Sequence, residues 1–373
     1  MSKQKIMFVS AANSIHTIRW VNALSEFFEI HLVYCKGHSP KIDKPNDSIK
    51  LHELKYKAPF GYYTNAWELK NLYNKIQPNL VNVHYASGYG TLVRISKIGP
   101  TLLSIWGSDI YDFPTESRIK KRILQKNVYY ANAIASTSHI MAKRLKEIVP
   151  NITNEIFITP FGVDIEKFKK QNKKEKETFN IGNIKTLEKK YGIEYGILAI
   201  KKLIDNLKKQ GKNQEANCIR MYIYGDGSQK EELQKLIMNN DLSNIVFLKG
   251  KIPNDQVPIA LDELDIFCAT SVLDSESFGV SVVEAMSCNL PVVASDVDGF
   301  CEVMLDGKTG YIVERKNVVQ IAEALEKLML NPEIRENMGQ AGRKRVEENY
   351  NWTENVKYMK SIYEKLAKKI NNG

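Results

Sequence analysis

Residues 274–295 read DSESFGVSVVEAMSCNLPVVAS, and this stretch combines a polar loop, a helix and a buried strand. The loop carries Glu276, and the helix carries Glu284 eight positions later. The apolar run 291–294 is typical of a fully buried strand. The turn 277–281 places backbone N–H groups at the start of a helix, where they are able to bind an anion. The pattern predicts two carboxylates beside an anion site; the alternative is an ordinary glycine turn followed by a helix.

Short apolar runs rich in β-formers alternate with helix-like segments along the whole chain. Such runs indicate parallel sheets that are covered on both faces. Twelve strands are too many for one core, so we predict two sheets of six strands. The predicted strands are 6–10, 30–34, 80–85, 101–106, 133–137 and 156–159 in the first half, and 178–184, 220–224, 245–248, 265–269, 291–294 and 311–313 in the second.

A polar, lysine-rich run at 167–177 follows the segment PFGVD at 160–164 and is typical of an exposed linker. The fold class expected is therefore α/β, with two Rossmann-like domains, 1–165 and 166–352, that face each other across a cleft. A helix at about 353–373 is expected to cross back and pack on the first domain. Its apolar stripe consists of Val356, Met359, Ile362, Tyr363 and Leu366.

The net charge of the 373-residue chain, +10, is unevenly distributed. Residues 1–165 hold 21 Lys and Arg against 12 Asp and Glu, and the remaining residues hold 32 against 31. Nearly all of the excess lies in the first half, which indicates an anionic partner for that half; a contribution to solubility alone is the alternative.

Several classes of protein are excluded by simple patterns. Five cysteines without a CxxC pair exclude a disulfide scaffold and a zinc knuckle. The first strand is not followed by GxGxxG, and no GxxxxGK[ST] occurs, which excludes ordinary dinucleotide and P-loop sites. No apolar stretch approaches the roughly 18 residues that a membrane span needs, and the start does not resemble a signal peptide. We therefore expect a cytoplasmic protein.

The 274–295 stretch resembles the E-x7-E signature of the retaining GT-B glycosyltransferases of family 4, also called glycosyl transferases group 1. Six further segments match motifs of that family, and together they cover essentially the whole chain. They are PFGVD at 160–164, YGDG at 224–227, VFLKG at 246–250, GFCE at 299–302, DGKTG at 306–310 and YNW at 350–352. The resemblance implies transfer of a sugar from a nucleoside diphosphate sugar, a UDP-sugar being favoured, to a hydroxyl of a glycan or lipid-linked acceptor, in polysaccharide or glycoconjugate synthesis. It also implies front-face attack with retention.

The resemblance assigns roles in donor binding and catalysis. Glu284 is expected to bind the ribose hydroxyls, and Glu276 to contact the transferred sugar. A basic pair, which we assign to Lys185 and Lys190, is expected to neutralise the leaving diphosphate. Lys189 is the alternative if the register differs, and a solvated lysine face is the alternative interpretation. Because the basic pair is expected to supply the charge that stabilises the leaving diphosphate, no metal or other cofactor is expected. The remaining donor contacts expected are Gly225, Gly250, Lys251, Ile252, Phe278, Gly279, Val280 and Ser281.

The first domain is expected to bind the acceptor. His16 follows the first strand, and His84 and Tyr85 follow a later one in a region similar to the family's H-x-H loop. His84 is also a catalytic candidate. Trp106 stands where many members carry a histidine, and Asp109 is retained three positions later. The alternative for each histidine is a structural role in the core.

Two segments of the first half suit an anionic membrane surface. Residues 115–131 form a basic helical pattern, and 56–73 interleave aromatic residues with lysines. A peripheral position at the inner face of the cytoplasmic membrane is therefore expected, against the alternative of a solvated helix and an aromatic core.

Two other functions compete with the transferase. One is a GT-B sugar-nucleotide epimerase, which the E-x7-E segment disfavours. The other is a nucleic-acid-binding protein, suggested by the basic charge, but no recognisable binding module occurs. No nucleic acid and no obligate protein partner are expected.

Overall fold

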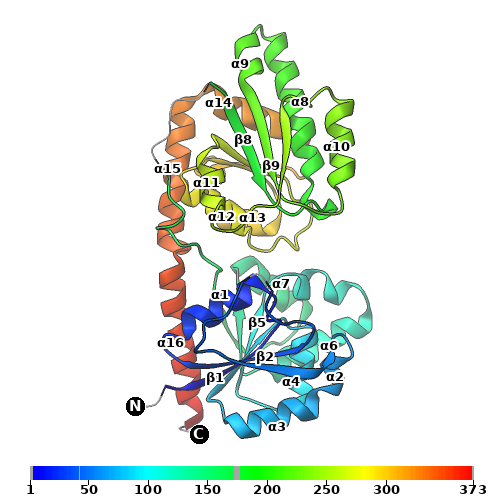
Figure 1. Cartoon of the computed structure of the whole chain (residues 1–373), viewed down its shortest axis with the longest axis vertical. Coiled ribbons are helices and arrows are strands. Elements are labelled where there is room, and N and C mark those ends of the chain that lie inside the picture. The colour runs from blue at the N-terminus through cyan, green and yellow to red at the C-terminus, as the bar shows by residue number, and fades with distance from the viewer. Residues whose placement is uncertain (1–2, 42, 172–176, 372–373) are drawn as a thin grey trace. The chain divides into compact units, whose positions relative to one another are not determined.

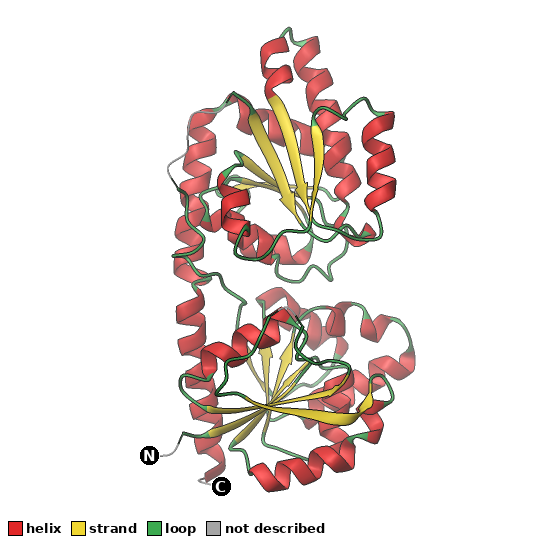
Figure 2. Cartoon of the chain, viewed as in Figure 1, coloured by secondary structure: helices red, strands yellow, loops and turns green. Residues whose placement is uncertain are grey.

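The structure, a computed structural model, describes residues 3–41, 43–171 and 177–371 (Figure 1). The chain forms two compact units: the first contains Met1–Phe161 and Thr353–Gly373, and the second contains Gly162–Trp352. The division lies between Phe161 and Gly162, whereas the linker pattern predicts a boundary between 165 and 166. Each unit has a parallel sheet with helices on both faces, so the predicted α/β class is confirmed (Figure 2).

The sheet of the first unit has seven strands in the described part of the chain, in the order β3-β2-β1-β4-β5-β6-β7, with all neighbours parallel. The order reverses between β1 and β4, and open α/β sheets bind ligands at the carboxyl end of such a reversal. The strands are β1 (Lys5–Val9), β2 (Glu29–Lys36), β3 (Lys50–Lys57), β4 (Leu80–His84), β5 (Thr101–Ile105), β6 (Ala133–Ser136) and β7 (Glu155–Ile158). The helices are α1 (Ile15–Leu24), α2 (Gly61–Thr64), α3 (Ala66–Ile76), α4 (Gly88–Ser96), α5 (Ser108–Tyr111), η1 (Phe113–Thr115), α6 (Arg118–Tyr130), α7 (His139–Ile148) and α16 (Trp352–Asn371).

Strand β3 corrects the prediction of six strands for this sheet. Its sequence, KLHELKYK, buries only Leu54, because the strand lies at the edge of the sheet. An edge strand needs no continuous apolar run, and its lysines discourage pairing with another chain. The apolar pattern that reveals the other strands is therefore missing here.

Helix α16 packs against the first unit, as its apolar stripe predicts. All five stripe residues are buried, and Tyr363 is fully buried between Phe8 and Phe28. The Asn82 side chain donates a hydrogen bond to the Tyr363 hydroxyl, and Ser104 Oγ donates to Asn82 Oδ1 at 3.0 Å. This buried polar chain fixes the register of the helix on β4 and β5, since each polar group would lose a partner if the helix slid.

The sheet of the second unit has six described strands in the order β10-β9-β8-β11-β12-β13, all parallel. All six correspond to predicted apolar runs, because each lies within a two-sided sheet whose core is rich in Ile, Leu and Val. The strands are β8 (Phe179–Ile184), β9 (Ile219–Tyr224), β10 (Val246–Gly250), β11 (Ile266–Ala269), β12 (Val292–Ser295) and β13 (Gly310–Val313). The helices are η2 (Lys189–Tyr191), α8 (Ile193–Lys209), α9 (Asn213–Cys218), α10 (Lys230–Asn239), α11 (Val257–Asp262), α12 (Val280–Ser287), α13 (Asp298–Val303), α14 (Val318–Leu330) and α15 (Pro332–Asn349).

His84 ends β4 inside the core of the first unit, with 1% of its surface exposed. Its ring packs edge-on against Phe8, with the ring centroids 5.3 Å apart. Burial, with a smaller contribution from the charge of His16, lowers the pKa of His84 to about 3. The imidazole is therefore neutral in the folded protein at pH 7.

This burial predicts how stability depends on pH. Between pH 6.5 and pH 3 the unfolded chain binds a proton at His84 that the folded chain does not, so stability falls as pH decreases. His84 alone should cost about 2 kcal/mol between pH 7 and pH 5. Urea unfolding at the two pH values should therefore show a smaller loss for His84→Leu than for the wild type. An equal loss in both proteins would contradict the buried neutral imidazole.

Candidate functional site

The carboxyl ends of β8 and β9 are held together by a glycine contact. Lys185 follows β8, and its backbone N–H donates to the Tyr224 carbonyl at 2.9 Å. Gly225 comes next after β9 with a φ of +152°, and a Cβ built on it would lie 1.9 Å from the Lys185 carbonyl oxygen. Only glycine permits this approach. The Gly225 N–H donates to the Gly250 carbonyl at 2.8 Å. The end of β10 therefore lies beside the carboxyl ends of β8 and β9.

A buried ion pair lies at this edge of the sheet. The Lys185 ammonium contacts Glu276 Oε2, and the two side chains are only 19% and 10% exposed. Although burial acts to lower it, the pKa of Lys185 is raised, because Glu276, Tyr191 and Glu284 stabilise the ammonium charge. Ser271 Oγ donates a longer hydrogen bond to Glu276 at 3.5 Å. The structure thus brings together two residues that lie 91 positions apart in the sequence and that the sequence assigns to donor chemistry.

Lys190 contacts the same aromatic ring as Lys185. The Lys185 and Lys190 ammonium nitrogens are 4.5 and 4.9 Å from the centroid of Tyr191, within the range of a cation–π contact. The Lys190 carbonyl accepts a hydrogen bond from Val272 N at 2.9 Å, which ties this loop to the segment after β11. Lys190 and Lys189 are exposed, whereas Lys185 is partly covered. Tyr191, which no sequence motif marks, therefore contacts both predicted lysines.

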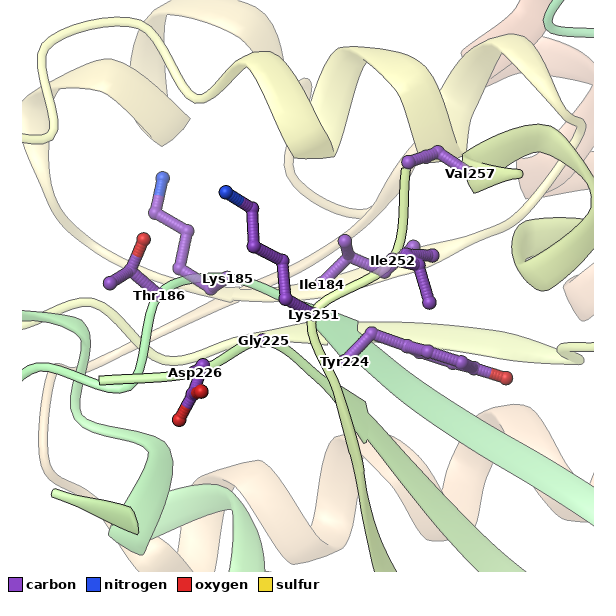
Figure 3. A pocket seen from close by; sticks show the side chains of 9 residues that line it. All are labelled: Ile184, Lys185, Thr186, Tyr224, Gly225, Asp226, Lys251, Ile252 and Val257. Atoms are coloured by element: carbon purple, nitrogen blue, oxygen red, sulfur yellow. The ribbon is translucent and has the colours of Figure 1, made fainter. Parts of the chain in front are cut away.

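A pocket of 260 Å³ opens beside Lys185. Four predicted donor residues line it or its rim, namely Lys185, Gly225, Lys251 and Ile252, and five others join them: Ile184, Thr186, Tyr224, Asp226 and Val257 (Figure 3). Lys185 and Lys251 extend to the same side of the pocket, whereas Asp226 points the opposite way. The volume is below the roughly 300–1,000 Å³ that is usual for pockets of drug-sized ligands. It suits one portion of a larger ligand.

The start of α12 is shaped by two glycines. Gly279 caps the helix with a φ of +76°, and its missing Cβ leaves room for the ring of Phe300. A Cβ on Gly299 would lie 2.1 Å from the Glu276 carbonyl oxygen. Phe278 is buried against Tyr350, so only its backbone is available to a ligand. The predicted Val280, Ser281 and Glu284 are half-buried on this helix.

Arg315 braces the loop that precedes Glu276. Its guanidinium contacts Asp274 at 3.0 Å and Asp296 at 2.9 Å. The same side chain therefore connects the loop after β11, the end of β12 and the end of β13. No family motif in the sequence marks Arg315, and only the spatial contact reveals it.

The predicted acceptor residues of the first unit form one aromatic cluster. The Trp106 ring lies within 6 Å of four others, with centroid distances of 4.3 Å to His84, 5.3 Å to Tyr85, 5.4 Å to Phe161 and 5.8 Å to His16. His16 stacks on Phe161 at 4.1 Å. These side chains come from the carboxyl ends of β4 and β5, the start of α1 and the segment after β7. Phe161 lies in the PFGVD motif, but the motif gives no sign of this contact.

Asp109 is buried and bonded to backbone groups. One carboxylate oxygen accepts hydrogen bonds from the amides of Trp106 and Gly107 at 3.1 and 2.9 Å, and the other accepts from Ala86 N at 2.8 Å. Only 1% of the residue is exposed. The carboxylate joins the loop after β4 to the loop after β5, so this geometry fits a role in positioning those loops better than contact with an acceptor.

Neither a metal site nor a membrane-spanning helix is found among the described residues. No group of three His, Cys, Asp or Glu in that part of the chain is arranged to hold a metal ion. Among the same residues, no helix is both long and apolar enough to cross a bilayer.

Two family models match the chain over both units. The model described as glycosyl transferase 4-like matches residues 5–138, and the model described as glycosyl transferases group 1 matches residues 164–345. The first matched stretch contains His16, His84, Tyr85 and Trp106 of the aromatic cluster, and Phe161 lies between the two matched stretches. The second contains Lys185, Glu276 and the pocket beside them.

Individual proteins agree with these models. An uncharacterized glycosyltransferase of Methanocaldococcus jannaschii is 25% identical over 95% of this chain and 94% of its own. The N-acetyl-alpha-D-glucosaminyl L-malate synthase of Bacillus anthracis is 22% identical over 92% of this chain and 91% of its own. The structure of HepE from Anabaena in complex with UDP superposes with a TM-score of 0.77 at 14% identity, over 97% of this chain and all of that one. The chain therefore belongs to the GT-B glycosyltransferases of family 4.

Proposed function

We propose that this glycosyltransferase moves a sugar from a nucleoside diphosphate sugar, with UDP-sugars favoured, to an acceptor hydroxyl with retention of configuration. The observation that carries the proposal is the contact of Lys185 with Glu276 beside the 260 Å³ pocket. The donor carries a negatively charged diphosphate directly bonded to a sugar with several hydroxyl groups. A lysine next to a carboxylate is complementary to these two neighbouring groups. The lysine binds the diphosphate, and the carboxylate accepts hydrogen bonds from the sugar hydroxyls.

The proposed chemistry needs no group beyond the donor, the acceptor and this chain. The bond between the sugar C1 and the diphosphate oxygen breaks, and the acceptor oxygen forms a new bond to C1 on the same face. The acceptor proton passes to the departing phosphate oxygen. Lys185 and Lys190 stabilise the negative charge that grows on the diphosphate, which is the usual way in which such a transition state is favoured. Glu284 binds the ribose, and no metal ion takes part.

The nature of the two substrates is supported by different observations. HepE, which has a similar fold, has been solved in complex with UDP, and this supports UDP as the nucleotide. The Bacillus anthracis relative is named for an L-malate product, so a small soluble acceptor is the alternative to a glycan or lipid-linked one. A sugar-nucleotide epimerase remains the competing enzyme class, and it would consume no acceptor.

Binding of the donor should raise the thermal midpoint of the protein. A donor at 100 times its dissociation constant stabilises the folded state by about 2.7 kcal/mol. We expect a shift with UDP-glucose or UDP-N-acetylglucosamine that is lost in Lys185→Ala, because the diphosphate loses its cation. Lys235→Ala, which removes an exposed lysine from α10 of the same unit, is the control and should keep the shift. If neither these UDP-sugars nor GDP-mannose raised the thermal midpoint of the wild type, the proposal of a nucleotide-sugar donor would be refuted.

Glu276→Gln should change binding and turnover in opposite directions. In the ligand-free protein the Glu276 carboxylate occupies Lys185, so it competes with the diphosphate for the same cation. The glutamine variant should bind UDP several-fold more tightly in calorimetry. It should nevertheless transfer sugar at least ten-fold more slowly, because the charged contact to the sugar is lost. Weaker binding of UDP by the variant would show that the carboxylate does not compete with the diphosphate.

We further propose that the first unit docks on an anionic membrane. This unit holds 26 Lys and Arg against 13 Asp and Glu, a net charge of +13, whereas the second unit has a net charge of −3. Phe60, Tyr63 and Trp67 are 80, 52 and 78% exposed at α2 and α3, and Ile119 is 70% exposed on the basic helix α6. Exposed aromatic residues beside lysines favour the interface of an anionic bilayer.

Sedimentation with vesicles tests the docking. The protein should sediment with vesicles that contain phosphatidylglycerol but not with pure phosphatidylcholine, and salt should release it. Combined substitution of Phe60 and Trp67 by Ser, or charge reversal at Lys121, Arg122 and Lys126, should abolish sedimentation while the UDP-sugar shift is kept. Tyr129→Ser, at the far end of α6, serves as the control. A wild-type protein that ignores anionic vesicles would favour the soluble acceptor instead.

A further inference from the structure

A turn at the carboxyl edge of the first unit presents a histidine that no motif marks. Strand β2 ends at Lys36, Gly37 follows with a φ of +87°, and His38 N donates to the Cys35 carbonyl at 3.0 Å. Strand β2 neighbours β1, and β1 neighbours β4, so this turn lies at the same edge of the sheet as the loop of Tyr85. The ring of His38 is half-buried.

One buried hydroxyl holds the ring of His38. Tyr89 is 2% exposed at the start of α4, and its hydroxyl lies 2.7 Å from His38 Nδ1. The same oxygen accepts a hydrogen bond from Cys35 N at 3.2 Å. The neighbouring Gly90 N donates to the Tyr85 carbonyl at 3.1 Å, so Tyr89 also adjoins the predicted acceptor loop.

These contacts determine which ring nitrogen carries the proton. The Tyr89 oxygen already accepts the Cys35 amide, so its own hydrogen is available to donate. A neutral imidazole nitrogen is a better acceptor than the nearby Cys35 thiol, which has only weak acceptor capacity. Tyr89 therefore donates to His38 Nδ1, and the proton of the neutral ring resides on Nε2.

The Nε2–H group remains available to a ligand. Within the described part of the chain, the side chain of His38 makes no hydrogen bond other than the one to Tyr89, and Nε2 is not among the buried atoms that lack a partner. Burial, followed by the charge of Lys41, lowers the pKa of His38, so the ring stays neutral near pH 7. A neutral ring in a fixed orientation offers one donor in one direction.

We propose that His38 binds the acceptor, with Nε2–H donating a hydrogen bond to an acceptor hydroxyl, and that Tyr89 is the positioning residue that fixes its tautomer. The proposal rests on the proposed transferase function and names one specificity contact of its acceptor side. A hydroxyl accepts the hydrogen bond and still keeps a proton to give away, whereas a protonated amine on the ligand could not accept it. The contact therefore favours an acceptor that offers an oxygen at this position over one that offers an ammonium group, and a hydroxyl of a sugar or a polyol meets this condition.

The tautomer is measurable without any substrate. In the full chain labelled with 15N-histidine, long-range 1H–15N spectra should show a protonated Nε2 and an unprotonated Nδ1 for His38, assigned by the loss of its signals in His38→Gln. Tyr89→Phe should convert this pattern to a mixture of tautomers. Tyr62→Phe is the matched control, because Tyr62 contacts the ring of Tyr89 at 5.2 Å yet its hydroxyl makes no hydrogen bond among the described residues. A protonated Nδ1 in the wild type would overturn the proposal.

Ligand binding is tested on the same samples. Octyl β-D-glucoside and glycerol, used as hydroxylated probes, should shift the Nε2–H signal of His38 in a saturable way. With a probe that accepts sugar, His38→Ala should raise the KM for that probe about ten-fold, the value of one lost hydrogen bond, and His38→Gln should recover part of it. Hydrolysis of the donor by water should not change. No shift with either probe, or an unchanged KM in His38→Ala, would overturn the proposal.

The two proposals fail in different ways. If no nucleotide sugar shifts the thermal midpoint, the proposed transferase substrate is wrong whatever the state of His38. If the donor binds and its sugar is transferred, while the Nε2–H signal of His38 does not shift and His38→Ala leaves the acceptor KM unchanged, only the proposed acceptor contact is wrong.

Discussion

The candidate donor site depends on the close approach of Gly225 to the Lys185 carbonyl. A side chain at position 225 would push β8 and β9 apart at their carboxyl ends, and Lys185 would no longer face Glu276. The ion pair in turn supports the burial of both charges. Removing one partner of such a buried pair typically costs about 3–5 kcal/mol, because the other charge is left without compensation. The contact between Lys185 and Glu276 therefore depends on the absence of a side chain at position 225.

In the first unit, too, single side chains connect separate elements of the fold, and two buried polar side chains hold loops and strands in position. Asp109 uses both carboxylate oxygens to join the loops after β4 and β5, and Tyr89 uses one hydroxyl to join β2 to α4. These groups are buried, so each is worth more than it would be in water.

Much of the fold and part of the site follow from the sequence, for identifiable reasons. Twelve of the described strands coincide with apolar runs of the sequence. Such a run can be recognised from neighbouring residues alone. Strand β3 is not such a run, because its sequence KLHELKYK alternates charged with other residues and buries only Leu54. Glu276 and Lys185 are predicted from the resemblance to the family motifs, and the structure brings the two side chains into contact. Arg315, Tyr191 and the pair of His38 and Tyr89 are not predicted in this way, because their roles arise from contacts between residues that no local pattern connects.

The distribution of charge also explains how the two units can treat anions differently. The first unit carries its excess of lysine and arginine on exposed helices, where it attracts any anionic surface within about a Debye length. In the second unit the buried lysine is already neutralised by Glu276, and the unit as a whole is slightly acidic. A free anion gains little there, because it must displace a carboxylate that is tethered beside the lysine. A ligand gains only if it fills the pocket and offers the carboxylate a new partner at the same time, and a nucleoside diphosphate sugar meets both conditions.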